Sequence, residues 1–169
     1  MLGVKIIIYS FIFLTSSGIG ILISKKYEDR VNELKEFKNA LNMFKTKVKF
    51  TYEPIPEIFE EISRNINSKP GKIFKLASIN MKLVTAGQAW NMAVDTDMLS
   101  INEEDRNVLK NLSKLLGQTD IDGQISQIDL TNSFLDEQIK KAEKERLKCE
   151  KLYRTMGMIV GLAIVIILM

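Results

Sequence analysis

The sequence predicts an all-α protein, in which an antiparallel helical bundle of about six helices lies between an N-terminal and a C-terminal transmembrane helix. Three observations predict this class. Residues 6–24 and 155–169 contain no charged side chain, and apart from Lys5 all charged side chains lie between them. In the middle part, apolar residues recur every three or four positions, as on a helix with one buried face. The chain also contains only three prolines, so few positions interrupt a helix.

The first apolar segment, residues 6–24, is long enough to cross a bilayer. At about 1.5 Å per residue it forms a helix of about 28 Å, close to the ~30 Å hydrocarbon core. It carries small residues that would let another helix approach closely, namely Ser16, Ser17, Gly18 and Gly20. The alternative is a cleaved signal peptide. However, the apolar run exceeds the usual ~7–15 residues, and no A-x-A-like cleavage site follows it.

The last apolar segment, residues 155–169, reaches only about 22 Å as a helix. Leu152 and Tyr153 extend its apolar face, and the long side chains of Lys151 and Arg154 can reach the headgroups. We expect this segment to cross the bilayer, with local thinning or with packing partners. A tail that enters the bilayer without crossing it is the alternative.

Basic residues are concentrated on the inner sides of both apolar segments, and only Lys5 and the amino terminus lie beyond them. By the positive-inside rule, the chain divides into a transmembrane helix (1–24), a cytoplasmic bundle (25–154) and a second transmembrane helix (155–169). We expect it in the cell membrane, with both tips outside. The basic residues expected to flank the membrane are Lys25, Lys26, Arg30, Lys148, Lys151 and Arg154.

The first helix of the bundle, residues 25–50, is expected to continue the first membrane helix without a break. Its apolar seam consists of Tyr27, Val31, Leu34, Phe37, Leu41, Phe44 and Val48. Pro54 and Pro56 begin a second helix that ends near Ile66, because proline is favoured in a first helical turn. Glu57, Glu60 and Glu61 lie in its first turns, where the helix dipole favours negative charge.

Three short helices are predicted next, over residues 70–84, 85–97 and 103–116. Trp90 lies on an apolar face of the fourth helix and is expected in the core. Asn102 is the expected N-cap of the fifth helix, and Gly117 is the expected residue at its C-terminal end.

The sixth helix, residues 122–153, is long and carries a second seam. Its members are Ile125, Ile128, Leu135, Ile139, Ala142, Cys149 and Tyr153, and two further seam positions are polar, Asn132 and Arg146. Cys149 is expected to act as a small buried apolar residue rather than as a reactive thiol. We expect the first and last helices to pack antiparallel as a stalk.

The residue inventory offers little for catalysis or for metal binding. With no histidine and one cysteine, the chain can form neither a typical zinc site nor a Ser/His/Asp or Cys/His arrangement. Pro70-Gly71-Lys72 lacks the first glycine and the hydroxyl residue of a phosphate-binding loop. The net charge of +3, without basic residues interleaved with aromatics, argues against nucleic acid. We expect no enzymatic activity, no cofactor and no metal; an enzyme would have to rely on carboxylates or lysines.

The glycine pattern of the second half carries a resemblance. Thr85–Val94, which includes Gly87, is followed after one helix by Leu115–Gln124, in the order LLGQTDIDGQ. This order resembles the cytoplasmic module of the inner-membrane platform family of type II secretion and type IV pilus systems. A second resemblance is to the stage III sporulation protein AB family. It covers residues 115–150, the basic stretch after them and the terminal apolar run. It also covers LKEFKNALNMFKTKVKFTYEPIPEIF near the start. The general platform proteins have two such modules, whereas this chain has one.

The resemblance implies a platform or scaffold subunit of a secretion-like channel complex between mother cell and forespore. It implies a place in the mother-cell-derived membrane around the forespore, with the module in the mother-cell cytoplasm. The implied partners are a secretion-type ATPase, stage III sporulation protein AA, and other membrane proteins of the same complex. Pairing of the seams between copies would give a homo-oligomer. The alternative function is a membrane-anchored coiled-coil scaffold unrelated to transport.

Two groups of residues are candidates for binding a partner. The first group consists of exposed acidic residues, which could steer a basic partner surface toward the bundle. Their position near helix starts is also explained by the helix dipole, which favours negative charge there. They are Glu53, Glu57, Glu60, Glu61, Glu103, Glu104 and Asp105. The second group is the turn with Gly117, Asp120 and Gly123, where glycine needs no side-chain clearance. A cap and corner is the plainer interpretation of that turn.

Overall fold

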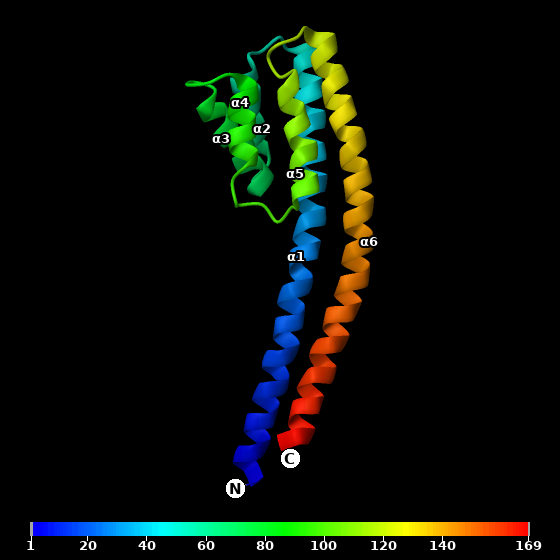
Figure 1. Cartoon of the computed structure of the whole chain (residues 1–169). Helices are drawn as coiled ribbons and strands as arrows, with labels where there is room; N and C mark the ends of the chain where they lie inside the picture. The colour runs from blue at the N-terminus through cyan, green and yellow to red at the C-terminus, as the bar shows by residue number, and fades with distance from the viewer. Residues whose placement is uncertain (1, 169) are drawn as a thin grey trace. The chain divides into compact units, whose positions relative to one another are not determined.

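The computed structural model is helical throughout most of the residues it describes, which are 2–168. Side chains are described for residues 15, 22, 24–153, 155–156, 159–160, 162–164 and 166. The elements are α1 (Leu2–Phe50), α2 (Ile55–Asn65), α3 (Lys69–Asn80), α4 (Ala86–Val94), α5 (Glu103–Lys110), the 3₁₀ helix η1 (Asn111–Lys114) and α6 (Ile121–Leu168). Figure 1 labels the six α-helices. The prediction of an all-α protein is confirmed, and α1 continues without a break through residues 2–50 as expected.

Within the part of the chain whose side chains are described, no helix offers a stretch that is long and apolar enough to cross a membrane. The predicted first span, residues 6–24, lies outside these side chains except for Thr15, Leu22 and Ser24. The predicted last span, residues 155–169, lies outside them in part.

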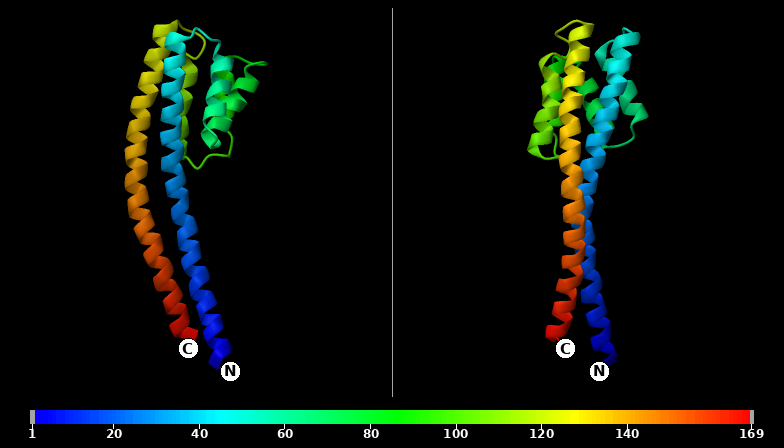
Figure 2. Two further views of the ribbon diagram at one scale, coloured as in Figure 1. Left: turned by 180° about the vertical axis from the view of Figure 1, so that it is seen from behind. Right: turned by 90° about the vertical axis from the view of Figure 1, so that its right-hand side faces the viewer.

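The chain forms two compact units, and α1 and α6 contribute to both. The first unit consists of Met1–Val31 and Lys141–Met169, and the second unit is Asn32–Lys140. In the second unit, α1 and α6 lie side by side and antiparallel in all the views of Figures 1 and 2. There α2 packs on α3, α3 on α4, and α4 on α5 and η1.

A cluster of aromatic rings forms the core of the second unit. Phe37, Phe44, Phe59, Phe74 and Trp90 are all fully buried. The ring of Phe59 lies 4.8 Å from that of Phe74 and 5.0 Å from that of Phe44, both in T-shaped contacts. The indole of Trp90 donates a hydrogen bond from Nε1 to the Leu109 carbonyl at 2.7 Å, which satisfies its polar group. The prediction that Trp90 belongs to the core is confirmed.

The predicted seams of the first and last helices meet in this unit. Leu34, Leu41 and Val48 of α1 and Ile128 and Leu135 of α6 are buried. One polar pair lies within this apolar interface: Nδ2 of Asn132 on α6 donates a hydrogen bond to Oδ1 of Asn42 on α1 at 3.0 Å. Ion pairs border it, with Lys38 Nζ 2.5 Å from Asp136 Oδ1 and Lys45 Nζ 2.6 Å from Asp129 Oδ1.

Three of the predicted short helices are shorter than expected. α3 ends at Asn80 and α4 begins at Ala86, because Thr85 takes an extended conformation and caps α4 through its side chain. α5 ends at Lys110, where Ser113 Oγ donates to the Lys110 carbonyl and the chain continues as a 3₁₀ helix. The prediction that Asn102 caps α5 is confirmed, since its side chain accepts a hydrogen bond from the backbone N–H of Asp105.

Candidate interaction surfaces

The acidic residues of α2 lie at its surface, and two of the three are engaged in ion pairs. Glu57 and Glu60 are exposed. Glu60 Oε1 accepts a hydrogen bond from Arg64 Nη2 at 2.6 Å, and this bond lowers the pKa of Glu60. Glu61 Oε2 accepts one from Lys47 Nζ at 2.6 Å, which raises the pKa of Lys47. The face is therefore partly neutralised within the chain, and Glu57 is its most available carboxylate.

The acidic residues at the start of α5 differ from the sequence expectation in one case. Asp105 was expected to be exposed, but it is fully buried, because its carboxylate accepts from the backbone N–H of Asn102 and completes the capping box. Glu104 accepts a hydrogen bond from Gln138 Nε2 on α6 at 3.0 Å. Glu103 lies 3.4 Å from Arg106 Nε. These contacts hold the start of α5 in place, which is a structural role.

The turn that precedes α6 has the geometry of a cap and corner. Gly117 has φ +72°, a left-handed conformation in which glycine is favoured. A Cβ atom there would lie 3.3 Å from Ala86 Cβ, so this turn packs against the start of α4. Asp120 Oδ1 accepts from the N–H of Gly123 at 2.9 Å and caps α6. The structure thus brings the three predicted turn residues together, and their role toward a partner stays a prediction.

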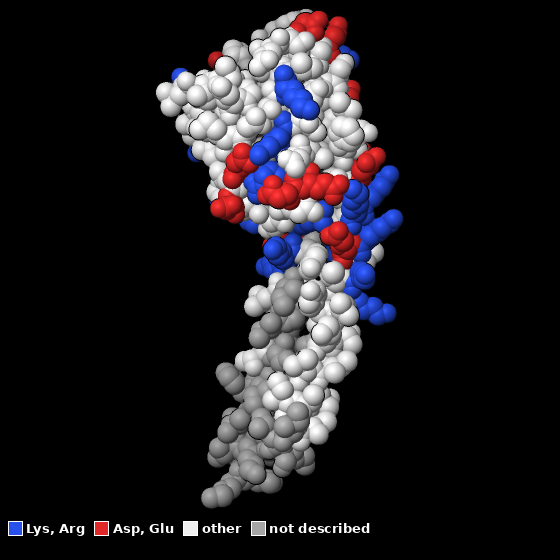
Figure 3. All heavy atoms as spheres, viewed as in Figure 1, with Lys and Arg blue, Asp and Glu red and all other residues white. Residues whose placement is uncertain are grey.

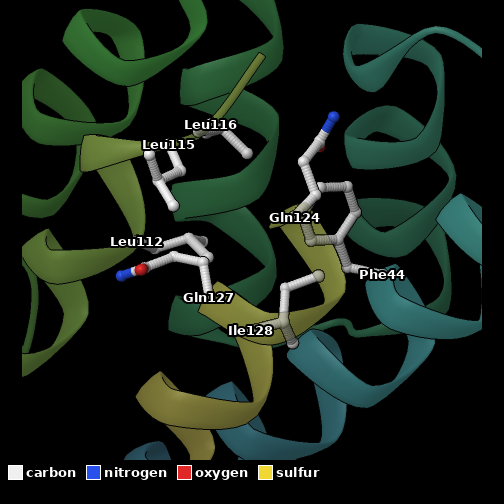
Figure 4. A pocket seen from close by; sticks show the side chains of 7 residues that line it. All are labelled: Phe44, Leu112, Leu115, Leu116, Gln124, Gln127 and Ile128. Carbon is white, nitrogen blue, oxygen red and sulfur yellow. The ribbon is translucent and has the colours of Figure 1, made fainter. Parts of the chain in front are cut away.

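A shallow apolar hollow lies beneath this turn. Figure 4 shows its lining, which comes from α1, η1, the turn and α6: Phe44, Leu112, Leu115, Leu116, Gln124, Gln127 and Ile128. The space amounts to about 150 Å³ including the part open to solvent, and it leaves no room for a water molecule. Gln127 Nε2 is engaged with the Asn111 carbonyl at 2.7 Å. The hollow is therefore a gap in packing rather than a ligand pocket.

Glu33 and Gly87 form contacts between distant parts of the second unit that the sequence did not predict. Glu33 is nearly buried, with 7% of its side chain exposed, and it accepts hydrogen bonds from Lys69 Nζ at 2.9 Å and from the N–H of Ser100 at 2.6 Å. Gly87 lies so close to η1 that a Cβ would be 2.4 Å from the Ser113 carbonyl oxygen. The sequence signal was weak in both cases: a charge beside an apolar seam, and a glycine within a predicted helix.

The first unit contains a cluster of two tyrosines and the single cysteine. The rings of Tyr27 on α1 and Tyr153 on α6 are stacked, with centroids 6.2 Å apart. Hydrogen bonding with the Cys149 side chain, and then with Tyr153, raises the pKa of Tyr27 to about 12. Cys149 is half-buried rather than fully buried as expected.

The basic residues predicted to flank the membrane fall into two groups. Lys25, Lys26, Lys148 and Lys151 are exposed. Arg30 is instead buried, and its Nη1 lies 2.5 Å from Oε2 of Glu145 on α6, so it fastens the two helices rather than facing lipid. The side chain of Arg154 lies outside the described residues. Among the side chains that are described, no three of Asp, Glu and Cys come together as a metal site.

Comparisons with known proteins agree with one another. The family model described as Stage III sporulation protein AB (spore_III_AB) matches residues 5–169. The chain is 23% identical over 163 residues to Stage III sporulation protein AB of Bacillus subtilis (strain 168), covering 94% of this chain and 95% of that protein. The chain also resembles the solved structure of Stage III sporulation protein AB (SpoIIIAB), with a TM-score of 0.65 and 20% identity, over 70% of this chain and 96% of that one. At this identity, the structural match shows a shared fold.

Proposed function

Because the chain belongs to the stage III sporulation protein AB family, we propose that it is a non-enzymatic membrane platform subunit of a secretion-like channel complex between mother cell and forespore. In this role it links a cytoplasmic secretion-type ATPase, stage III sporulation protein AA, to other membrane proteins of the complex. The observation that carries the proposal is the family match over residues 5–169, nearly the whole chain.

Membrane anchoring at both ends is part of the proposal. Residues 6–24 and 155–169 carry no charge. The exposed Lys25 and Lys26 follow the first segment, and the exposed Lys148 and Lys151 precede the second. The bundle then lies in the cytoplasm, and the chain sits in the cell membrane, by resemblance the mother-cell-derived membrane around the forespore. Extraction of membranes with alkaline carbonate tests the anchoring: we expect the chain to stay in the pellet, and release into the supernatant contradicts it.

Continuous helices suit a protein that transmits force from a partner. α1 and α6 each lead from the bundle into one of the uncharged end segments without a break. In the first unit the two helices are fastened by Arg30 and Glu145. In the second unit they are fastened by Lys38 and Asp136. A push by the ATPase on the bundle would therefore act on both membrane segments together.

The exposed acidic face of α2 is the proposed contact for the ATPase, because its carboxylates can steer a basic surface. Glu57→Lys is the cleanest variant, since Glu60 and Glu61 also serve ion pairs within the chain. We expect the full chain with Glu57→Lys, and more strongly with Glu57, Glu60 and Glu61 all changed to Lys, to co-purify less ATPase from sporulating cells. Glu137→Lys, an equal charge change at an exposed position in the middle of α6 and away from both candidate sites, is the matched control. Unchanged recovery with the triple variant removes this contact from the proposal.

One observation favours the scaffold alternative. Leu130 and Phe134 lie one helical turn apart on α6 and are 48% and 37% exposed, which suits pairing with another helix. Sedimentation of the purified full chain in detergent separates the two functions. A scaffold self-associates and loses this on Leu130→Ser with Phe134→Ser, whereas a platform subunit binds the ATPase whether or not these residues are changed.

A further inference from the structure

A stripe of lysines runs along α6 beside the segment that we propose to enter the bilayer. Lys141, Lys144, Lys148 and Lys151 are all exposed. Their spacing of three or four residues places them on one face of the helix, over about 15 Å. All four belong to the first unit. Figure 3 shows Lys and Arg side chains gathered along this edge of α6, and the described surface toward its C-terminus carries none.

The acidic residue best placed to neutralise this stripe is used elsewhere. Glu145 lies four residues after Lys141 and three before Lys148, spacings at which ion pairs form along a helix. Its Oε2 instead accepts from Arg30 on α1, a buried guanidinium. Glu145 therefore balances a buried cation, and neighbouring lysines at these spacings repel one another. The stripe accordingly favours an anionic partner from outside the chain.

The apolar residues of the same stretch indicate what that partner is. Leu147 and Leu152 are 63% and 48% exposed. Together with Lys148, Lys151 and Thr155 they line an open hollow. Glu150 borders an adjoining hollow, and this residue takes part in another interaction within the chain. A lysine presents an apolar stem and a charged head, which suits the boundary between acyl chains and headgroups. Exposed leucines beside lysines, next to an uncharged segment, favour a lipid over an acidic protein helix.

The geometry points to an anionic phospholipid site on α6, in which the lysine stripe binds headgroup phosphates and Leu147 and Leu152 contact the acyl chains. This inference rests on the proposed membrane anchoring and deepens it. The headgroup layer is about 5–8 Å thick on each side of the hydrocarbon core. Lys148 and Lys151, nearest to Thr155, are therefore the direct ligands. Lys144, about 16 Å along the helix from Thr155, acts from beyond this layer over the Debye length of about 8 Å. Lys141, about 21 Å from Thr155 and with a further interaction within the chain, contributes least.

The test uses the full chain in nanodiscs of equal parts phosphatidylcholine and phosphatidylglycerol, with native mass spectrometry of the lipids that stay bound. The attraction of one lysine to an anionic lipid surface, about 1 kcal/mol, corresponds to about a fivefold preference for anionic over neutral lipid. We therefore expect phosphatidylglycerol to be enriched at least about fivefold over phosphatidylcholine among the bound lipids. This enrichment should fall as the salt concentration is raised. Changing the four stripe lysines to Gln should remove the enrichment. The matched control changes four exposed lysines of the second unit to Gln, namely Lys49, Lys72, Lys75 and Lys114, and should keep it.

Two results overturn the site: no enrichment in the wild type, or equal enrichment in the stripe variant. If the stripe variant keeps its lipid but loses an acidic protein that co-purifies with the wild type, the stripe is a protein interface instead. Failure of the anchoring itself is seen separately, because carbonate then releases the chain. A chain that stays in the membrane pellet without enrichment refutes the lipid site alone.

Discussion

At Gly87, α4 approaches η1 so closely that the interface has no space for a side chain. A Cβ atom added at Gly87 would lie 2.4 Å from the carbonyl oxygen of Ser113. This oxygen belongs to the backbone of η1, so it cannot rotate away as a side chain could. Overpacking of this kind shifts whole elements rather than single side chains. Gly87 is thus a condition for the packing of α4 that local helix preference does not reveal.

We predict that Gly87→Ala destabilises the chain by about 1–3 kcal/mol. Unfolding of the full chain in mild detergent, followed by circular dichroism in guanidinium, measures this. Asn91→Ala on the same helix, at a half-buried position, adds no Cβ and serves as a comparison. If the denaturation midpoint of Gly87→Ala equalled that of the wild type, α4 and η1 would have to lie further apart than they do in this structure.

Among the described side chains, Tyr27 is the residue whose pKa is most clearly altered. Hydrogen bonding with Cys149 and Tyr153 raises its pKa to about 12, against an ordinary value of about 10. The folded chain therefore favours the neutral phenol. The resulting stability is fully present below pH 10 and is lost as the pH rises from about 10 to about 12.

We predict that the difference in absorbance at 295 nm between wild type and Tyr27→Phe titrates near pH 12. The stability advantage of the wild type over Tyr27→Phe should shrink across the same pH range. Cys149→Ala should lower the midpoint, because it removes the leading hydrogen-bond partner. A midpoint near pH 10 in the wild type would show that Tyr27 does not make these contacts.

Among the elements, α4 and α5 are short helices that depend on their first turns. Helices of this length are marginal in isolation, so capping and tertiary packing decide whether they form. The side chains of Thr85 and Asn102 each accept a hydrogen bond from the backbone N–H three residues later. The side chains of Gln88 and Asp105 in turn accept one from the backbone N–H of the cap residue. Asp105 does this while fully buried, so the cap of α5 is also part of the core.

We predict that Thr85→Ala and Asn102→Ala each cost about 1 kcal/mol of unfolding free energy. Asn102→Asp should retain most of the stability, because aspartate caps about as well. Thr46→Ala, at an exposed position inside α1, is the control and should be close to neutral. Equal denaturation midpoints for Thr46→Ala and Asn102→Ala would argue against the capping boxes.

At the scale of the whole molecule, the distribution of charge along the chain is the basis of the membrane topology that we propose. If the uncharged end segments span the membrane as we propose, the basic residues between them favour both tips outside and residues 25–154 inside. The stripe on α6 adds lysines on the inner side of the second segment. Both features oppose transfer of the bundle across the membrane.

We predict that, in growing cells that express the chain without sporulating, a cysteine introduced at Leu2 reacts with a membrane-impermeant maleimide while the cells are intact. One introduced at Asn39, an exposed position of α1, should react only after permeabilisation. Both are made in a Cys149→Ser chain, so that the native thiol does not contribute. Labelling of the Asn39 position in intact cells would reverse the topology and with it the proposed contact with a cytoplasmic ATPase.

The sequence by itself determined the helices, their seams and most of their caps. These depend on neighbours three or four residues away, and the 3.6-residue period and side chains such as Asn102 display such relations directly. For the same reason, the corner at Asp120 and Gly123 was predictable as a cap. The expectation that Gly117 directly follows the fifth helix was wrong, because α5 ends at Lys110 and the chain continues as η1. The resemblance of residues 115–150 to a family also needed only the order of residues along the chain.

Only the tertiary structure decided the fate of individual charges and the close approaches between helices. Arg30 was predicted to face the membrane surface, but its partner Glu145 comes from the other end of the chain and buries it. Glu33 is buried because Lys69 and Ser100 both reach it, and Gly87 is constrained by Ser113. The lysine stripe gains its significance in the same way, since Glu145 is drawn away from it across the helix pair. The physical reason is common to all four: the energy of a charge or a close contact depends on which distant residue folding brings next to it.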